Sequence, residues 1–452
     1  MRRIVRCTSG DPARAGRRWR TTGGACPSTS KRIPSPHRTP EGLRPSASRC
    51  PRNWCAPPPP WYAEHPRLCA LRRIGVSRAG RPLHLLSVGH ADAAVLVVAG
   101  AHANEPAGGP AVRRLAERVA ADPALRARTS WHFLLCADPD GARLHRMRAP
   151  GSLLEYHRRF YRPRGAEQPE WSPSYVPPHR LPPETLALTG ALDELRPYLQ
   201  VSLHGTDLGG SWVQVTRDIP GLAEPFAKSA AELRIPVEAG PSDAVGWPVS
   251  GPGVHVMPEP GTGTPFPSVP EDVRHSTWHH IHRYGGRTAV VEVPLWASDR
   301  VTDLTPHPDP AAALRASAHR LRTHTRDVTR VLTTALPHLP GPPGPLTRSA
   351  RWILDLSPAL ADDWERLPPR TPPPPTSPAW KPSAAASPPR RRHAPPRTDP
   401  PPPPVSHHSR TPRHPLVPRL HHPLHPRWVP LEAQTEHQTR TTLAAALHTP
   451  HP

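Results

Sequence analysis

Proline restricts where this chain can build a hydrophobic core. It accounts for 72 of the 452 residues, about three times its usual share. Residues 368–452 hold 25 of these prolines, including the runs Pro372–Pro375 and Pro400–Pro404. Because proline donates no backbone hydrogen bond, such stretches are poor helices and strands. We therefore expect one folded domain over residues 69–367, between a disordered Arg/Pro-rich extension over 1–68 and a disordered Pro/Arg/His-rich tail over 368–452.

The positive charge of the chain is concentrated in the same two end segments. Residues 1–68 contain 14 Lys and Arg against 3 Asp and Glu, and residues 368–452 contain 11 against 3. The segment between them contains 33 against 30, so the expected folded domain is almost neutral. A basic balance of this kind is not evidence for a nucleic-acid-binding domain. We expect no nucleic-acid partner beyond weak polyanion binding by the basic ends.

No targeting or membrane segment is recognisable. The basic first residues are not followed by the apolar stretch of a signal peptide. The longest apolar run, Ala93–Ala101, is too short to cross a bilayer. Most of the six cysteines lie in or beside the first end segment, and their spacing is not that of a disulfide framework. We expect a cytoplasmic protein without a membrane partner.

Strands and helices are predicted to alternate between the two ends. The apolar run Ala94–Gly100 is typical of a strand buried on both faces. Further strands are predicted at Trp131–Cys136, Leu199–Leu203, Trp212–Thr216 and Thr288–Val293, and helices at Ala111–Ala121, Leu222–Leu233 and Pro310–Leu336. This alternation predicts an α/β domain in which helices cover both faces of a mixed sheet.

Candidate metal ligands lie at the ends of these strands, where open α/β sheets bind their ligands. His102 and Glu105 follow the first strand, His204 follows the third, and Glu292 lies within the last. A hydrolytic zinc ion needs three nitrogen or oxygen ligands, an open position and a carboxylate that is not a ligand. His102, Glu105 and His204 could hold one zinc ion per chain, with Glu292 as general base. For Glu292, which is costly to bury alone, the alternative is a structural pair with an arginine.

A second group of histidines offers an alternative metal site. The segment HSTWHHIH contains His275, His279, His280 and His282, two of which are four residues apart. A helical zinc site of the H-E-x-x-H type also requires a glutamate between its histidines, and this segment has none. The segment is more typical of a polar loop.

Five motifs resemble those of the zinc metallocarboxypeptidase family, whose relatives include the succinylglutamate desuccinylase and aspartoacylase group. AGAHANEPAGGPAV resembles the first metal motif of that family, and Ile74–Gly89 resembles its entry into the sheet. ADPDGARL, SLHGTD and VVEVP then follow in the family's order. The resemblance implies a zinc carboxypeptidase-like α/β/α fold. It also implies zinc ligands at His102, Glu105 and His204, and a general base at Glu292.

The chain departs from digestive-type carboxypeptidases between these motifs. Those enzymes hold the substrate carboxylate with an Asn-Arg pair, which is missing from the corresponding region here. The region instead offers Arg143, Arg146, Arg148, Arg158, Arg159 and Arg162. An arginine fork suits a carboxylate or a developing oxyanion. We expect substrate-binding arginines among Arg143, Arg159 and Arg162.

The sequence therefore predicts a zinc-dependent amide hydrolase of metallocarboxypeptidase type. Its substrate is expected to be a peptide C-terminus or an N-acylated amino acid. The alternative is a basic, proline-rich binding protein without enzymatic activity, whose central domain is an inactive relative of the peptidases.

Overall fold

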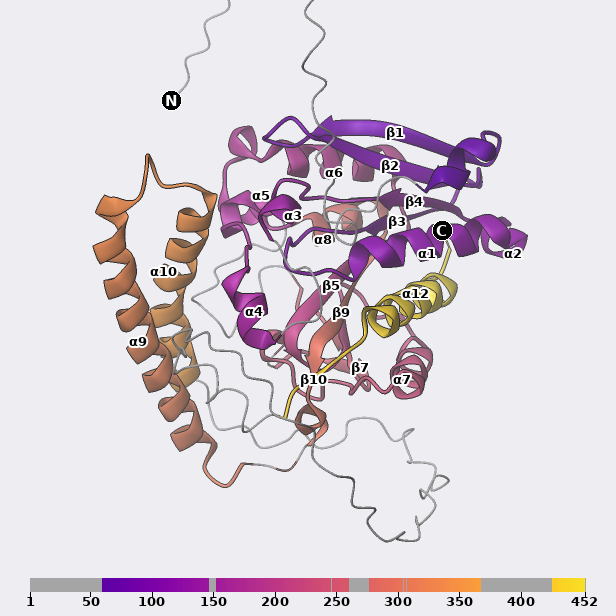
Figure 1. Cartoon of the computed structure of the whole chain (residues 1–452). Coiled ribbons are helices and arrows are strands. Elements are labelled where there is room, and N and C mark those ends of the chain that lie inside the picture. The colour runs from indigo at the N-terminus through magenta and orange to yellow at the C-terminus, as the bar shows by residue number, and fades with distance from the viewer. Residues whose placement is uncertain are drawn as a thin grey trace, which may run out of the picture. The chain divides into compact units, whose positions relative to one another are not determined.

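The computed structural model describes residues 59–145, 152–244, 246–259, 276–303, 305, 307–366 and 425–451. All of them belong to one compact unit, Arg49–Pro452. Its centre is a ten-stranded sheet in the order β1-β2-β4-β3-β5-β9-β6-β8-β7, with β10 paired to β9 (Figure 1). The strands are β1 (Cys69–Val76), β2 (Pro82–Val88), β3 (Ala94–Val98), β4 (Ser130–Leu134), β5 (Leu199–Gly209), β6 (Trp212–Val215), β7 (Val249–Gly251), β8 (Val254–Val256), β9 (Arg287–Ala297) and β10 (Arg427–Trp428).

The middle of the sheet is parallel. Strands β4, β3, β5 and β9 run in one direction. Strand β2 is antiparallel to β1 and β4, and β6 is antiparallel to β9 but parallel to β8. The helices are α1 (Gly108–Ala121), α2 (Pro123–Arg126), α3 (Gly141–Leu144), α4 (Leu153–Arg158), α5 (Ser172–Tyr175), α6 (Pro183–Leu195), α7 (Ala223–Glu232), α8 (Thr277–His280), α9 (Pro310–Ala335), α10 (Pro345–Arg366) and α12 (Leu431–His448).

Side chains alternate between the two faces of β3, and each face is covered by helices. Val95 and Val97 belong to the same core cluster as side chains of α1, α7 and α12. Leu96 and Val98 belong to a second cluster with side chains of α6. A strand with apolar side chains on both faces requires such cover on each side. The predicted α/β architecture, a mixed sheet between two layers of helices, is confirmed.

The structure corrects the prediction that residues 368–452 form a disordered tail. Residues 367–424 lie outside the described part, but β10 pairs with β9 and α12 contacts both α1 and α7 (Figure 1). Sequence reasoning missed α12 because most of its large buried side chains are polar, so it lacks the apolar pattern of a core helix. These side chains are Gln434, Thr435, His437, Gln438, Thr439, Thr441 and Thr442.

Two further boundaries differ from the prediction. Trp61, Tyr62 and Leu68 already pack against the main core cluster, so the domain begins before residue 69. The HSTWHHIH segment contributes Trp278 and Ile281 to the interior and is not a polar loop; residue 275 lies outside the described part.

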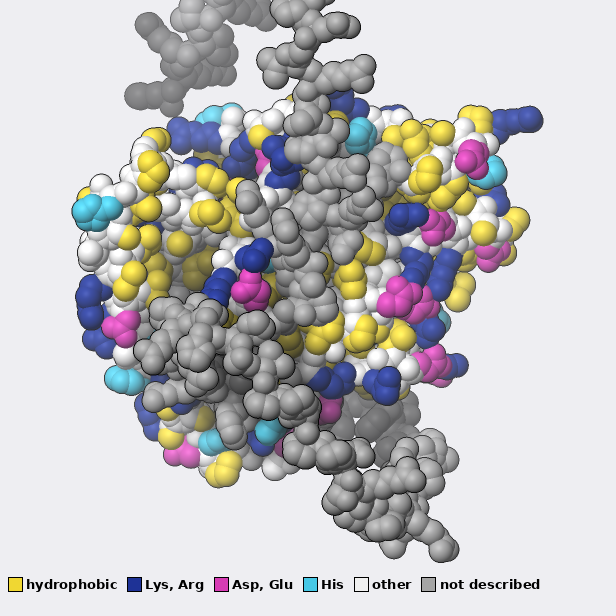
Figure 2. Space-filling view, in the orientation of Figure 1, with side chains coloured by type: hydrophobic (Ala, Val, Ile, Leu, Met, Phe, Trp, Pro, Cys, Tyr) yellow, Lys and Arg dark blue, Asp and Glu magenta, His cyan; other side chains and the backbone are white. Residues whose placement is uncertain are grey.

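Among the described residues, no helix combines the length and the apolar character needed to cross a membrane. Charged side chains of both signs lie side by side over α1, α7 and α12 (Figure 2). Arg114 and Arg118 of α1 pair with Glu436 of α12, and Arg440 of α12 pairs with Glu232 of α7. These ion pairs are partly open to solvent, where such pairs stabilise a fold only modestly. The fully buried contacts of α12 therefore matter more for how firmly the helix is held.

Candidate metal centre

The loop between β3 and α1 carries the first two candidate ligands. The chain leaves β3 through Gly100, whose φ of +64° lies in the left-handed region that glycine adopts without strain. A Cβ atom there would also lie 3.0 Å from the sulfur of Cys136. After this turn, Nδ1 of His102 lies 2.8 Å from Oε1 of Glu105. Both side chains are buried.

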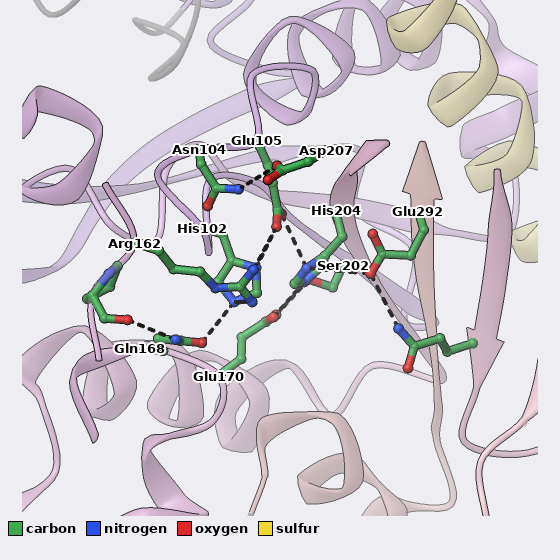
Figure 3. A network of polar contacts seen from close by, with 12 residues as sticks. His102, Asn104, Glu105, Arg162, Gln168, Glu170, Ser202, His204, Asp207 and Glu292 are labelled. Carbon is green, nitrogen blue, oxygen red and sulfur yellow. Dashed lines mark hydrogen bonds and ion pairs between the residues drawn. The ribbon is translucent and has the colours of Figure 1, made fainter. Parts of the chain in front are cut away.

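The third candidate ligand comes from the neighbouring strand. His204 on β5 is the register partner of Glu292 on β9. Its Nδ1 lies 3.3 Å from Oε2 of Glu105 and 4.0 Å from Oε1 of Glu292. His102, Glu105 and His204 each offer a ligand atom, and these atoms lie within 4.8 Å of one another (Figure 3). In the described part of the chain, they form the one group of three such residues close enough to hold a metal ion.

The far nitrogen of His204 is held by a buried carboxylate. Oε2 of Glu170 lies 2.8 Å from Nε2 of His204, and Ser202 donates a hydrogen bond of 2.7 Å to Oε1 of Glu170 (Figure 3). A carboxylate accepts hydrogen bonds and cannot donate them, so Nε2 of His204 carries a proton. In the neutral ring, this leaves the lone pair of Nδ1 directed at Glu105.

The far nitrogen of His102 has two neighbours of opposite character. Oε1 of Gln168 lies 3.1 Å from Nε2 of His102, while the Gln168 amide nitrogen donates to the carbonyl of Pro163. This second bond fixes the Gln168 oxygen as the atom facing His102. Nη2 of Arg162 also lies 3.0 Å from Nε2 of His102, and arginine can only donate. Gln168 therefore favours a proton on Nε2, and Arg162 favours a proton on Nδ1.

Burial and charge move the pKa values of the two histidines in opposite directions. Burial and the charge of Arg162 lower the pKa of His102 to about 4. Burial alone would lower the pKa of His204 too, but the carboxylates of Glu105 and Glu170 raise it to about 9. Burial would raise the pKa of Glu105, yet the two histidines bring it down to about 2. The protein thus compensates two buried carboxylates with positive charge on His204.

Glu292 stands beside this group without joining it. Its side chain accepts a hydrogen bond of 3.3 Å from Gln214 on β6. Burial, together with the negative charges of Glu105 and Asp243, raises the pKa of Glu292 to about 8 against the opposing effect of His204. A carboxylate with a raised pKa is suited to accept and release a proton near neutral pH. Among the described residues, no arginine forms an ion pair with Glu292, as the alternative of a structural pair would require.

Of the three predicted substrate arginines, Arg162 contacts two of the candidate ligands: its Nη2 atom lies 3.0 Å from Nε2 of His102. Its Nη1 lies 3.6 Å from Oε1 of Glu105. Arg159 forms an exposed ion pair with Glu155 within α4, and Arg143 is half-buried on α3. Residues 146 and 148 lie outside the described part.

Sequence reasoning missed three buried residues around the group: Gln168, Glu170 and Asn104. Gln168 and Glu170 belong to a segment with several prolines and no helical or strand period, so no pattern pointed to them. Asn104 was within the first metal motif but received no role. It donates to the hydroxyl of Tyr156 and, at 3.5 Å, to Asp207.

The alternative histidine site is not assembled in the described residues. The rings of His279 and His282 lie 4.7 Å apart, whereas His280 binds the exposed Asp193. A pair of histidines without a third ligand is short of the three or four ligands that zinc sites use.

A comparison with protein families finds a zinc-binding family that matches the segment carrying His102, Glu105 and His204. Residues 61–208 match the family model described as zinc carboxypeptidase, a segment that contains His102, Glu105 and His204. This match confirms the resemblance inferred from the motifs. Glu292 lies beyond the matched segment. No curated protein sequence matches the chain.

The solved structures that resemble the chain are distant. A metallo-carboxypeptidase from Burkholderia cenocepacia is 22% identical, with a TM-score of 0.31; the match covers 50% of this chain and 56% of that one. Bovine thrombin-activatable fibrinolysis inhibitor, solved in complex with tick carboxypeptidase inhibitor, is 14% identical with a TM-score of 0.31, and the match covers 50% and 80%. Similarities this weak carry no argument about activity.

Proposed function

We propose that the chain is a zinc-dependent amide hydrolase of metallocarboxypeptidase type. His102, Glu105 and His204 hold one zinc ion, and Glu292 is the general base. The observation that carries this proposal is the convergence of three buried ligand atoms within 4.8 Å, next to a fourth residue whose carboxylate remains outside the group. Zinc hydrolases need this combination of three ligands and a separate base.

The surroundings of the three side chains fit a metal ion. Oε2 of Glu105 is buried and has no hydrogen-bond partner among the described residues. Glu170 accepts a hydrogen bond from Nε2 of His204, and Gln168 offers an acceptor to Nε2 of His102. With both Nε2 atoms protonated, both Nδ1 atoms would be free to bind a cation. Outer carboxylates and carbonyls commonly orient metal-binding histidines in this way. A cation would also replace the positive charge that His204 otherwise supplies.

The protein's own residues then act on water and substrate. When bound, zinc supplies Lewis-acid chemistry, which polarises a carbonyl and makes water acidic near neutral pH. Glu292 takes the proton of the attacking water and returns it to the leaving amine. If Nδ1 of His102 held the metal, its Nε2 would carry the proton toward Gln168, and the guanidinium of Arg162 would have no lone pair to bind on that ring. Arg162 is then available to the carbonyl oxygen or carboxylate of the substrate.

We propose a peptide C-terminus or an N-acylated amino acid as substrate. Arg162 supports this substrate class, because its guanidinium lies beside His102 and Glu105. An arginine fork matches a carboxylate or an oxyanion with two parallel hydrogen bonds. Family membership of residues 61–208 supports peptide-like substrates at the same coarse level.

Metal analysis and turnover of the full chain test this proposal together. The parent should hold about one zinc ion per chain, and His102→Ala or His204→Ala should lose most of it. His279→Ala, which removes a buried histidine outside the group, is the control and should keep it. Glu292→Gln should keep its zinc, yet lower kcat on N-acylated amino acids or short peptides by about 10²–10⁴-fold. Full zinc with unchanged kcat would contradict the role of Glu292.

A further inference from the structure

We propose that α12 is a positioning element of the metal centre, through two consecutive residues that hold the main chain of the two site strands. This inference rests on the proposed function, since it assigns α12 a role toward the proposed zinc ligand His204 and the proposed base Glu292. Gln438 acts on the strand that carries His204. His437 acts, through a serine, on the strand that carries Glu292.

Gln438 binds the proposed ligand residue directly. Its amide nitrogen donates a hydrogen bond of 2.7 Å to the main-chain carbonyl of His204, and its side chain is fully buried. The neighbouring strand β3 ends at Val98, which pairs with Ser202. His204 thus lies two residues beyond the end of that pairing, where β3 no longer supports β5. Gln438 provides a fixed contact at this point.

His437 reaches Glu292 through a chain of buried hydrogen bonds. The hydroxyl of Ser211 donates to the main-chain carbonyl of Glu292 at 2.6 Å. Because its hydrogen is used there, Ser211 can only accept from Nε2 of His437, which lies 2.9 Å away. Nδ1 of His437 then accepts from Ser229 on α7, at 2.8 Å. In this series of hydrogen bonds, each group can donate only to the next one, so the bonds all run from Ser229 toward the carbonyl of Glu292.

The contacts of Gln438 and His437 differ from the other contacts of α12 in the residues that they reach. The partly exposed ion pairs of α12 join it to α1 and α7. Gln438 and His437 lead instead to His204 and Glu292, register partners whose Nδ1 and Oε1 atoms lie 4.0 Å apart. Ligands held within a few tenths of an ångström bind a metal better than loosely held ones. Losing a supporting contact therefore weakens metal binding even when the fold survives.

The helix contains a close match for Gln438 that serves as control. Gln434 lies one turn earlier and is also fully buried. It donates a 2.7 Å hydrogen bond to a main-chain carbonyl too, but that carbonyl belongs to Val429, outside the metal group. The remaining oxygen of each amide is equally without a hydrogen-bond partner among the described residues. Replacing either glutamine by methionine removes one buried hydrogen bond of the same type and length from α12.

The test compares zinc affinity in the full-length parent, Gln438→Met and Gln434→Met by competition with a chelator, using zinc alone as the probe. Both variants should melt at similar temperatures without metal. Only Gln438→Met should bind zinc about 10-fold more weakly, the lower end of the range for outer contacts. Equal zinc affinity in the two variants would overturn the role of Gln438. If Gln438→Met does not fold, Gln438→Asn, whose amide is too short to reach the carbonyl, replaces it.

Ser211→Ala tests the contact to Glu292 separately. It should lower kcat on the N-acylated amino acids and short peptides named above. KM and zinc affinity should stay near the parent values, because the zinc ligands keep their contacts. Unchanged kcat in the folded variant would overturn this half of the inference. A parent chain that binds no zinc would instead overturn the proposed function, and the role of α12 with it.

Discussion

Glu170 and His204 form a buried pair in which a loop residue fixes a residue of the central sheet. The carboxylate accepts from Nε2 of His204 at 2.8 Å and from Ser202 at 2.7 Å. Ser202 and His204 are two residues apart on β5, so their side chains emerge from the same face of the strand. Both oxygens of Glu170 are therefore committed to one strand. The loop that carries Arg162 and Gln168 is thereby held over the metal group.

Glu170→Gln should weaken zinc binding by about 10- to 100-fold, the usual effect of losing an outer partner of a metal-binding histidine. The amide keeps the shape of the side chain but loses the charge that holds the proton on Nε2 of His204. Competition with a chelator measures the change. Glu167→Gln is the matched control, because Glu167 lies in the same loop and pairs with Arg164 and Arg348 rather than with a histidine. A similar loss of affinity in both variants would argue against a specific role of Glu170.

Arg162→Ala should lower kcat/KM on the N-acylated amino acids and short peptides by about 10²–10³-fold, the usual rate loss when one donor to a developing oxyanion is removed. It should leave about one zinc ion bound, because Arg162 is not a proposed ligand. Arg162→Lys should not restore the rate, since an ammonium group cannot make two parallel bonds. Arg159→Ala, which removes an exposed arginine paired with Glu155, is the control and should behave as the parent. If Arg159→Ala lost as much activity, the assignment of the substrate arginine would need to change.

Asp138 should make the domain less stable as the pH rises from about 4 to about 7. Burial, which a hydrogen bond from the Gly141 amide only partly offsets, raises the pKa of Asp138 to about 7. Over this pH range the unfolded chain loses the proton while the folded domain keeps it, so stability falls by up to about 1.4 kcal/mol per pH unit.

Asp138→Asn removes this dependence and still offers an oxygen to Gly141. The melting temperature of the variant, relative to that of the parent, should increase between pH 4 and pH 7. A difference that stays constant over this range would show that Asp138 does not titrate there.

A chain that ends at Arg366 should lose its cooperative thermal transition. Such a chain lacks β10 and α12, and the carbonyl of His204 and the core cluster beneath α12 become exposed. Differential scanning calorimetry of this chain, the parent and a chain that ends at Thr449 makes the comparison. The chain ending at Thr449 keeps α12 whole and should melt like the parent. A cooperative transition without α12 would show that the sheet is stable without its last helix.

The hydrophobic pattern predicted the central sheet well, for a simple reason. A strand such as Ala94–Val98, covered on both faces, must be apolar throughout, and few other structures require this. Polar residues at the ends of such strands then mark the site. His102, His204 and Glu292 lie where the pattern placed them, and the structure brings them together.

The parts that were not predicted are the polar ones. Glu170 is buried because it binds His204 and Ser202, and nothing in its neighbouring residues indicates such partners. The helix α12 is buried through Gln438, His437 and several threonines, whose hydrogen bonds go to other elements. Hydropathy counts such residues as exposed, and the proline-rich composition before them reinforced the wrong conclusion. Only the three-dimensional arrangement shows what they bind.

The position of α12 in the sequence also sets the order in which this site is completed during synthesis. A ribosome makes all of the proposed ligands and Glu292 well before it reaches Leu431–His448. Domains start to fold while they are still being translated, so the sheet emerges with one end of its metal centre unsupported. The hydrogen bond from Gln438 to the carbonyl of His204, and the one from His437 to Ser211, form only after α12 has left the ribosome. The proposed metal centre thus acquires these supporting contacts only after all of its own residues have been made.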